Sequence, residues 1–228
     1  MSSRGLGDVY KRQILLLLDE SNLSAHFFLL LEHEGEHNPS IPFNHYAFDI
    51  LVDKLARHQA VGIHPSYNCS EEQLNVELNR FYQLLNTNAT KSRAHFIQLN
   101  FPKTYQVYLK NGIKNDYSMG YPELPGFRAG IARSFPFYDL EKEAETDLMI
   151  HPFVAMDATF EYYLTFLTEK EIELNVKKLC AVSNKYSGNF NMIFHNDIIS
   201  NHHSQKDWKY LHEKIIWDFR QDLSNDCV

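Results

Sequence analysis

The fold of this chain is constrained most by the alternation of short apolar runs with longer amphipathic segments. The run AHFFLLL is almost entirely apolar, which is typical of a strand buried on both faces of a parallel sheet. Because strands that alternate with helices form parallel sheets with helical crossovers, the pattern predicts one α/β domain, most simply a barrel. The predicted strands are Ala25–Leu31, Ala60–Ile63, Ala94–Leu99, Leu148–Ile150 and Phe190–Phe194.

Capping residues and helical spacing mark the predicted helices. Ser70 begins the sequence SEEQ, a capping-box pattern, and apolar residues recur every three or four positions after it. Tyr117–Phe137 is rich in glycine, proline and aromatic residues, which predicts a long structured loop. The predicted helices are the end of a helix at Ile14–Glu20, Asn44–His58 with Asn44 as N-cap, the helix after Ser70, Pro102–Asn111, Thr168–Lys185 and Lys206–Leu223.

Residues 1–13 differ from the rest of the chain. They read MSSRGLGDVYKRQ and show neither a capping pattern nor a periodicity. The run DVYKRQ resembles the translation of a transposase mosaic-end sequencing adapter. We therefore expect residues 1–13 to contribute no structure, and we assign residues 14–224 to the barrel domain.

Composition excludes several classes of protein. The chain has 228 residues, of which 44% are hydrophobic and 22% charged, so it can bury a sizeable core. A net charge of −7 without a basic run argues against nucleic acid or an anionic membrane as the main partner. No apolar run is longer than Ile14–Leu18, which is too short to span a bilayer. Three widely separated cysteines indicate a reducing compartment, and hence a cytoplasmic location.

Histidine follows three of the predicted strands directly. His64, His151 and His195 come after the apolar strings VGI, LMI and MIF. The carboxyl ends of parallel strands meet on one face of a barrel, where its site is built. Neutral imidazole binds zinc well, and histidine is the usual acid or base near pH 7. The three positions therefore predict a functional site.

Two arginines add to this site. Arg93 stands in the string RAH before His95, and Arg128 stands between two glycines in GFRAG. An arginine at such a place suits the orientation of a carboxylate or a substrate oxygen. The alternative for each is a pairing with an acid at the barrel rim. Other chemistries lack their motifs, since the chain contains no GxSxG, GxxxxGK[ST], GxGxxG or HExxH.

Several longer strings are recognisable as the motifs of a known family. HPSY, and DYSMGY together with GFRAG, are the most specific of them. By these motifs the chain resembles the polysaccharide deacetylase superfamily, carbohydrate esterase family four in the broad sense, and in particular a bacterial branch. The likeness extends from Ile14 to about Arg220, and its strings are SAHFFLLL, GIHPSY, SRAHF, DYSMGYPELPGFRAG, FYDLEKE, IHPFVAMD and FHND.

The resemblance implies a fold, a reaction and a cofactor. The fold is a distorted (β/α)₇ barrel. The reaction is the metal-dependent removal of acetyl groups from N-acetylated sugars, which hydrolyses an amide C–N bond that is not a peptide bond. A divalent metal, most simply Zn²⁺, and an N-acetylated saccharide substrate are expected with it. The oligomeric state is left open.

The resemblance also implies a metal shell. His64 matches the first histidine of the family's metal-binding motif. The family usually places a second ligand histidine four residues later, where this chain has Asn68. Either His95 or His151 is expected to complete the shell; the alternative is an altered metal site.

Catalytic and substrate-binding roles follow in the same way. Arg93 resembles the family arginine that orients the catalytic carboxylate, and Arg128 is a rival for that role. His195 resembles the late histidine that acts as general acid. His151 and Asp157 are expected to contribute to the substrate pocket. The expected substrate-binding residues are Tyr67, Tyr117, Tyr121 and Asp157.

One family element has no counterpart in the sequence. In this branch the first strand carries aspartates in a string close to THDVD, which act as base and metal ligand, and no such string occurs in the chain. We expect this strand to be missing upstream of Ile14, and the printed chain to be inactive or nearly so.

Two other functions stay open. One is a catalytically degenerate barrel that binds a glycan or a protein partner through Tyr117, Tyr121 and Phe127, and Asn68 in the ligand position favours it. The other is a metal-dependent hydrolase of a different amide or ester.

Overall fold

The computed structural model describes residues 25–32, 44–200 and 204–225. Backbone contacts divide the chain into two compact units, each described by itself. The first, called the sheet unit, comprises His26–Tyr121 and Phe127–Phe153. The second, called the helical unit, includes Pro122–Gly126 and the chain from Val154 onward. The expected helix end at 14–20 and the adapter-like residues 1–13 lie outside the described residues.

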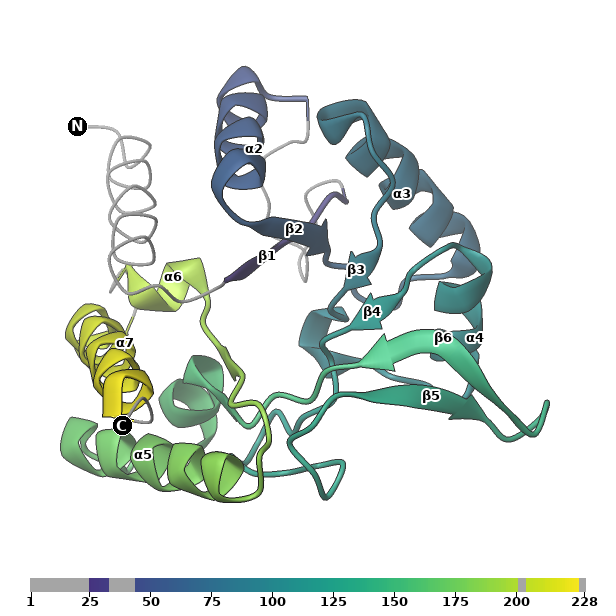
Figure 1. Ribbon diagram of the computed structural model, residues 1–228. Coiled ribbons are helices and arrows are strands. Elements are labelled where there is room, and N and C mark those ends of the chain that lie inside the picture. The colour runs from purple at the N-terminus through teal and green to yellow at the C-terminus, as the bar shows by residue number, and fades with distance from the viewer. Residues whose placement is uncertain (1–24, 33–43, 201–203, 226–228) are drawn as a thin grey trace. The chain divides into compact units, whose positions relative to one another are not determined.

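A six-stranded sheet organises the sheet unit, in the order β1-β2-β3-β4-β6-β5. All neighbours are parallel except β5 and β6, which form an antiparallel pair (Figure 1). The elements are β1 (His26–Leu29), α2 (Tyr46–His58), β2 (Ala60–Ile63), α3 (Glu71–Leu85), β3 (Lys91–Ser92), η1 (His95–Ile97), α4 (Lys103–Lys110), β4 (Asn115–Asp116), β5 (Phe135–Asp139) and β6 (Ala144–Ile150).

The core of the sheet unit lies between the sheet and α2, α3 and α4, which Figure 1 shows on one side of it. Leu29, Ile63 and Ile150 bury their side chains there. Each of the three is the last residue of its strand. Because side chains alternate between the two faces, the residue that follows each of them points to the opposite side of the sheet. The helices contribute Val52, Leu74, Phe81 and Tyr105 to the same cluster.

The α/β class and the parallel order are confirmed, whereas some element boundaries were wrong. The predicted strand Ala94–Leu99 is a 3₁₀ turn after the two-residue strand β3, because Phe96 and Ile97 have φ angles of 53° and 56°, outside the extended region. The expected loop Tyr117–Phe137 ends where β5 begins. The cap of α2 is His45, whose Nδ1 accepts from the amide of Ala47 at 3.2 Å, rather than Asn44.

Barrel closure is not seen in the part of the chain that the structure describes. β1 and β5 are the two edges of the six-stranded order, and the antiparallel strand β5 was not predicted. No helix among the described residues is long and apolar enough to cross a membrane.

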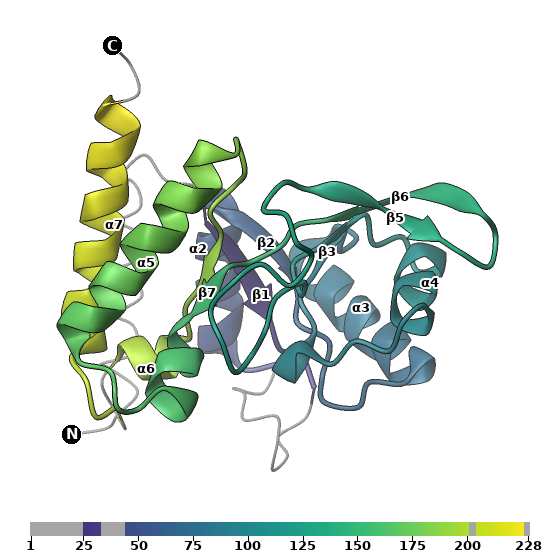
Figure 2. The same ribbon diagram turned by 90° about the horizontal axis from the view of Figure 1, so that it is seen from below.

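The described residues of the helical unit form a pair of parallel strands and four helical segments. α5 and α7 lie side by side in Figures 1 and 2, and Lys177 of α5 pairs with Asp218 of α7 at 3.0 Å. Thr168 and Glu171 form the capping box of α5. The elements are β7 (Ala155–Met156), η2 (Thr159–Tyr163), α5 (Glu169–Lys185), β8 (Met192–Ile193), α6 (Asn196–Ile199) and α7 (Trp208–Asn225).

A buried carboxylate ties the short strands β3 and β4 together. Asp116 is fully buried and accepts hydrogen bonds from Ser92 Oγ at 3.0 Å and from Tyr105 Oη at 3.1 Å. The amide and hydroxyl of Ser118 also donate to it, at 3.0 and 2.8 Å. Burial raises the pKa of Asp116 to about 6, although these donors oppose the shift.

We predict that Gly120→Ala destabilises the protein. A Cβ at Gly120 would lie 2.4 Å from two atoms of the Phe153 ring, and Phe153 is itself buried. Crowding of this kind costs about 1–3 kcal/mol, measurable by urea unfolding. Phe153→Leu in the Gly120→Ala background is expected to recover part of the loss. An alanine variant as stable as the parent would contradict the packing described.

Asp116 is predicted to make stability depend on pH. Its folded-state pKa lies above its ordinary value of 3.8, so the native state binds more protons than the unfolded state between these two values. Stability relative to Asp116→Asn, which has no charge to gain, is therefore expected to fall as pH rises from 4 to 7, by up to about 3 kcal/mol. Denaturant unfolding of both proteins at several pH values measures this, and a constant difference would contradict it.

Candidate functional site

Four of the predicted site residues lie in one register row across the sheet. Ile63 pairs with Ser92, Ser92 with Asp116, and Asp116 with Ile150. The residues that follow them are His64, Arg93, Tyr117 and His151, called the strand-end row below. Backbone hydrogen bonds continue this register into the row. The amide of Arg93 donates to the carbonyl of Ile63, the amide of Tyr117 to that of Ser92, and the amide of His151 to that of Asp116.

The strand-end row faces away from α2, α3 and α4. Alternation along the strands puts it on the opposite side from the buried Ile63 and Ile150. Phe28 of β1 packs there as well, with its ring 5.4 Å from Tyr117 and 5.5 Å from the Arg93 guanidinium. Within the sheet unit, His64 and His151 therefore lie on the same face of the sheet at the carboxyl ends of parallel strands, with β3 and β4 between β2 and β6.

His64 and His95 form a close imidazole pair. Their ring centroids are 4.7 Å apart, and the amide of His95 donates to the carbonyl of Pro65 at 3.1 Å. Nδ1 of His64 lies 2.5 Å from the carbonyl oxygen of Arg93. A carbonyl only accepts, so Nδ1 carries the proton and Nε2 carries the lone pair.

A buried glutamate holds the turn after His64. Glu77 of α3 is fully buried and accepts from the hydroxyl and amide of Ser66 at 2.5 and 3.2 Å. Burial raises the pKa of this carboxyl. The HPSY turn is thereby fixed from behind. Beyond it, Asn68 has a φ of 53°, a left-handed conformation that asparagine adopts more readily than most residues.

The predicted metal ligand His151 has both ring nitrogens in contact with protein. Nδ1 lies 2.8 Å from Ser134 Oγ, and Nε2 lies 2.8 Å from Asn115 Oδ1. Its ring stacks on Tyr117 with centroids 4.4 Å apart. Burial, with the nearby Lys91 cation, lowers the pKa of His151, while burial and the charge of Asp116 raise the pKa of Tyr117 to about 12.

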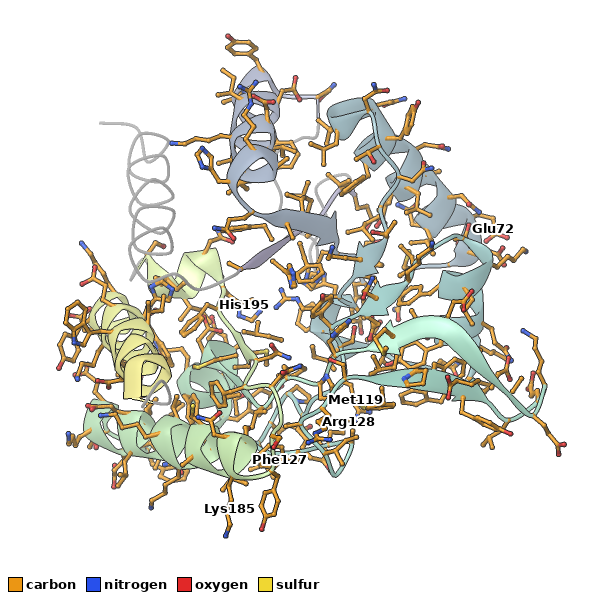
Figure 3. The ribbon with its side chains drawn as sticks, viewed as in Figure 1. Glu72, Met119, Phe127, Arg128, Lys185 and His195 are labelled. Atoms are coloured by element: carbon orange, nitrogen blue, oxygen red, sulfur yellow. The ribbon has the colours of Figure 1, made fainter. Side chains whose placement is uncertain are left out.

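The other predicted residues of the sheet unit lie on its loops. Arg128 donates to the carbonyl of Gly120 at 3.1 Å and lies 6.0 Å from the ring of Tyr121, so it stabilises the loop that carries it. Figure 3 shows Arg128 beside Met119. Tyr67 packs edge-on against Phe96. Phe96 is 58% exposed and stacks on His95.

A pocket of about 520 Å³ opens beside His95. It lies between the HPSY turn, the η1 turn and the start of α4. Its polar lining includes Asn68, Gln98 and Lys103. The pocket places polar side chains and the Lys103 cation next to His95.

The helical unit carries a second cluster, built on β7 and β8. Asp157 follows β7, and His195 lies two residues after β8 and projects from the chain before α6 (Figure 3). Asp157 is fully buried, and its oxygens lie 2.6 Å from Nδ1 and from the amide nitrogen of His195. It also accepts from the amide of Ala158 at 2.7 Å. This geometry makes Asp157 a positioning residue for His195.

His64 and His95 fit zinc as a pair of ligands. Neutral imidazole is a usual zinc ligand, and a ligating histidine commonly donates its other nitrogen to a carbonyl, as His64 does. Within residues 25–32, 44–200 and 204–225, no three His, Cys, Asp or Glu side chains form a group that could hold a metal. The imidazole of His151 is hydrogen-bonded to Ser134 and Asn115 instead. A zinc ion here needs a ligand beyond the pair.

Sequence reasoning missed several residues that shape these clusters. Glu77 lies three residues after Leu74 and four before Phe81, on the buried face of α3, and this spacing was a signal for its burial. Ser134 and Asn115 had none, because their contact with His151 depends on the unpredicted strand β5.

No family model matches the sequence, and no curated protein matches it. Solved structures match in fold. A candidate polysaccharide deacetylase from Mycobacterium smegmatis has a TM-score of 0.65 at 12% identity, covering 94% of this chain and 72% of that one. A candidate polysaccharide deacetylase from Pseudomonas aeruginosa has a TM-score of 0.60 at 10% identity, covering 91% and 65%.

A third structure agrees with these two. It is a candidate polysaccharide deacetylase involved in O-antigen biosynthesis from Bordetella bronchiseptica, with a TM-score of 0.53 at 13% identity, covering 92% of this chain and 75% of that one. At such identities the likeness concerns the fold. The expectation from the HPSY, DYSMGY and GFRAG motifs is confirmed at that level: the chain has the fold of the polysaccharide deacetylases.

Proposed function

We propose that the protein is a metal-dependent hydrolase that removes acetyl groups from N-acetylated saccharides. The observation that carries the proposal is the imidazole pair of His64 and His95, with rings 4.7 Å apart, at the carboxyl end of a parallel strand in this fold. A carbohydrate substrate is supported by the Bordetella protein of the same fold, which is described as involved in O-antigen biosynthesis.

In this proposal, His64 and His95 hold a divalent metal, most simply Zn²⁺. The carbonyl of Arg93 accepts from Nδ1 of His64 and so fixes the tautomer in which Nε2 carries the lone pair for the metal. Glu77 keeps the HPSY turn rigid through Ser66. When bound, the metal polarises the acetamide carbonyl and lowers the pKa of a coordinated water.

The family resemblance assigns the role of general acid for the leaving amine to His195, which belongs to the helical unit. Asp157 accepts from Nδ1, so the proton that His195 delivers is on Nε2. The His195 side chain is 32% exposed whereas Asp157 is buried, and only His195 is therefore available to a substrate. The base expected from the family is a carboxylate of the THDVD string, which the sequence lacks, and Arg93 is its expected partner.

A second function is favoured by one observation. The described residues contain no three-ligand metal group, which suits a barrel that binds glycans through Tyr117, Tyr121 and Phe127 without hydrolysis. Saccharide binding that is unaffected by zinc or chelator would support this alternative over the hydrolase.

We predict that the chain binds one zinc ion through His64 and His95. Isothermal titration is expected to show stoichiometric binding to the full chain, and a loss of at least tenfold in affinity for His64→Ala and His95→Ala. His58→Ala, which removes an exposed histidine at the end of α2, serves as the matched control. Equal affinity in His64→Ala would contradict the metal assignment.

We predict that Asp157→Ala releases His195 from a single tautomer. In the parent, ¹⁵N NMR of the histidine side chains is expected to show His195 protonated at Nδ1. In the variant it is expected to show a mixture of the Nδ1- and Nε2-protonated tautomers, because the acceptor for Nδ1 is lost. With zinc-loaded protein and N-acetylglucosamine oligomers, His195→Ala is expected to lower any acetate release about 10²–10⁴-fold. A His195 tautomer unaltered by the loss of Asp157 would refute its positioning role.

A further inference from the structure

Ser134, His151 and Asn115 form a hydrogen-bonded chain of three side chains. Ser134 Oγ lies 2.8 Å from Nδ1 of His151, and Asn115 Oδ1 lies 2.8 Å from Nε2. Three strands fix them, because Asn115 is in β4, His151 directly follows β6, and Ser134 directly precedes β5. Phe135 pairs with Ile150 in the antiparallel ladder, which puts Ser134 opposite His151.

The asparagine determines which imidazole nitrogen is basic. Asn115 Oδ1 only accepts, so Nε2 of His151 carries the proton and Nδ1 carries the lone pair. The hydroxyl of Ser134 then donates to Nδ1. A hydroxyl that donates to an imidazole whose other nitrogen is held by an oxygen acceptor is the arrangement that activates a serine nucleophile. Relative to the usual serine triad, the two ring nitrogens exchange roles. Here Nδ1 accepts from the serine and Nε2 donates to the third residue.

The surroundings leave the cluster accessible and polar. Ser134, His151 and Asn115 are all half-buried. Tyr117 stacks on one face of the imidazole at 4.4 Å, which holds the ring in place. Lys91 pairs with Asn115 in the β3–β4 register, so a cation lies beside the cluster. The proposed deacetylase reaction uses neither Ser134 nor Asn115.

We propose that Ser134 is the nucleophile of a metal-independent acyl-transfer site that takes carboxylic esters. Ser134 Oγ bonds to the ester carbonyl carbon while its proton moves to Nδ1 of His151. The C–O bond to the alcohol then breaks, and the alcohol oxygen takes that proton, leaving acyl-Ser134. Water hydrolyses the acyl-serine with His151 again as base, returning the proton to Ser134 Oγ and releasing the carboxylic acid.

The test uses p-nitrophenyl acetate as the ester, with the full chain in EDTA. We expect a burst of p-nitrophenol approaching one equivalent of protein, and mass spectrometry of digested protein is expected to place one acetyl group on Ser134. Ser134→Ala is expected to abolish both signals, and His151→Gln to slow the burst about 10²–10³-fold. Ser200→Ala is the matched control, since its hydroxyl is bonded to the carbonyl of Asp197 without a histidine.

Ser134→Cys distinguishes the loss of the nucleophile in Ser134→Ala from a folding defect, because a thiol at the same place is expected to accept the acetyl group. Acetylation of other residues only, a burst unchanged in Ser134→Ala, or an unlabelled parent with native circular dichroism would each overturn the proposal. The zinc titration separates it from the deacetylase function. Labelling without zinc binding overturns only the latter, and zinc binding without labelling overturns only the acyl-transfer site.

Discussion

The candidate site depends on the parallel register of β2, β3, β4 and β6. Each pairing step brings the last residue of one strand opposite the last residue of the next, so the residues that follow form the strand-end row. Because side chains alternate between faces, the row points away from the helices while Ile63 and Ile150 bury their side chains among them. A shift of one residue between two strands would send part of the row into the core.

Buried carboxylates fix the functional segments from behind. Glu77 holds the turn after His64, Asp116 joins the ends of β3 and β4, and Asp157 holds His195. Each accepts hydrogen bonds from hydroxyl, amide or imidazole donors that would otherwise be unsatisfied in the interior. Such contacts restrict the rotamers of the residues that face solvent, and preorganised groups of this kind are what catalysis and metal binding require.

The sequence predicted well what depends on local periodicity. The strand before His64 and the helices capped by Ser70 and Thr168 are where apolar spacing and capping place them, and the motif resemblance identified the fold. It predicted poorly what depends on long-range pairing. The antiparallel strand β5 carries no distinctive pattern, so the bonding of His151 to Ser134 and Asn115 was not foreseen and the histidine was assigned to metal. The left-handed residues Phe96 and Ile97 likewise replaced a predicted strand with a 3₁₀ turn.

The central claim is that His64 and His95 together hold a metal ion at the end of a parallel strand. Anomalous diffraction at the zinc absorption edge, from crystals grown with one equivalent of zinc, tests it most directly. The account predicts one anomalous peak within bonding distance of an imidazole nitrogen of both residues. A peak located elsewhere, or bound to only one of the two histidines, would contradict it.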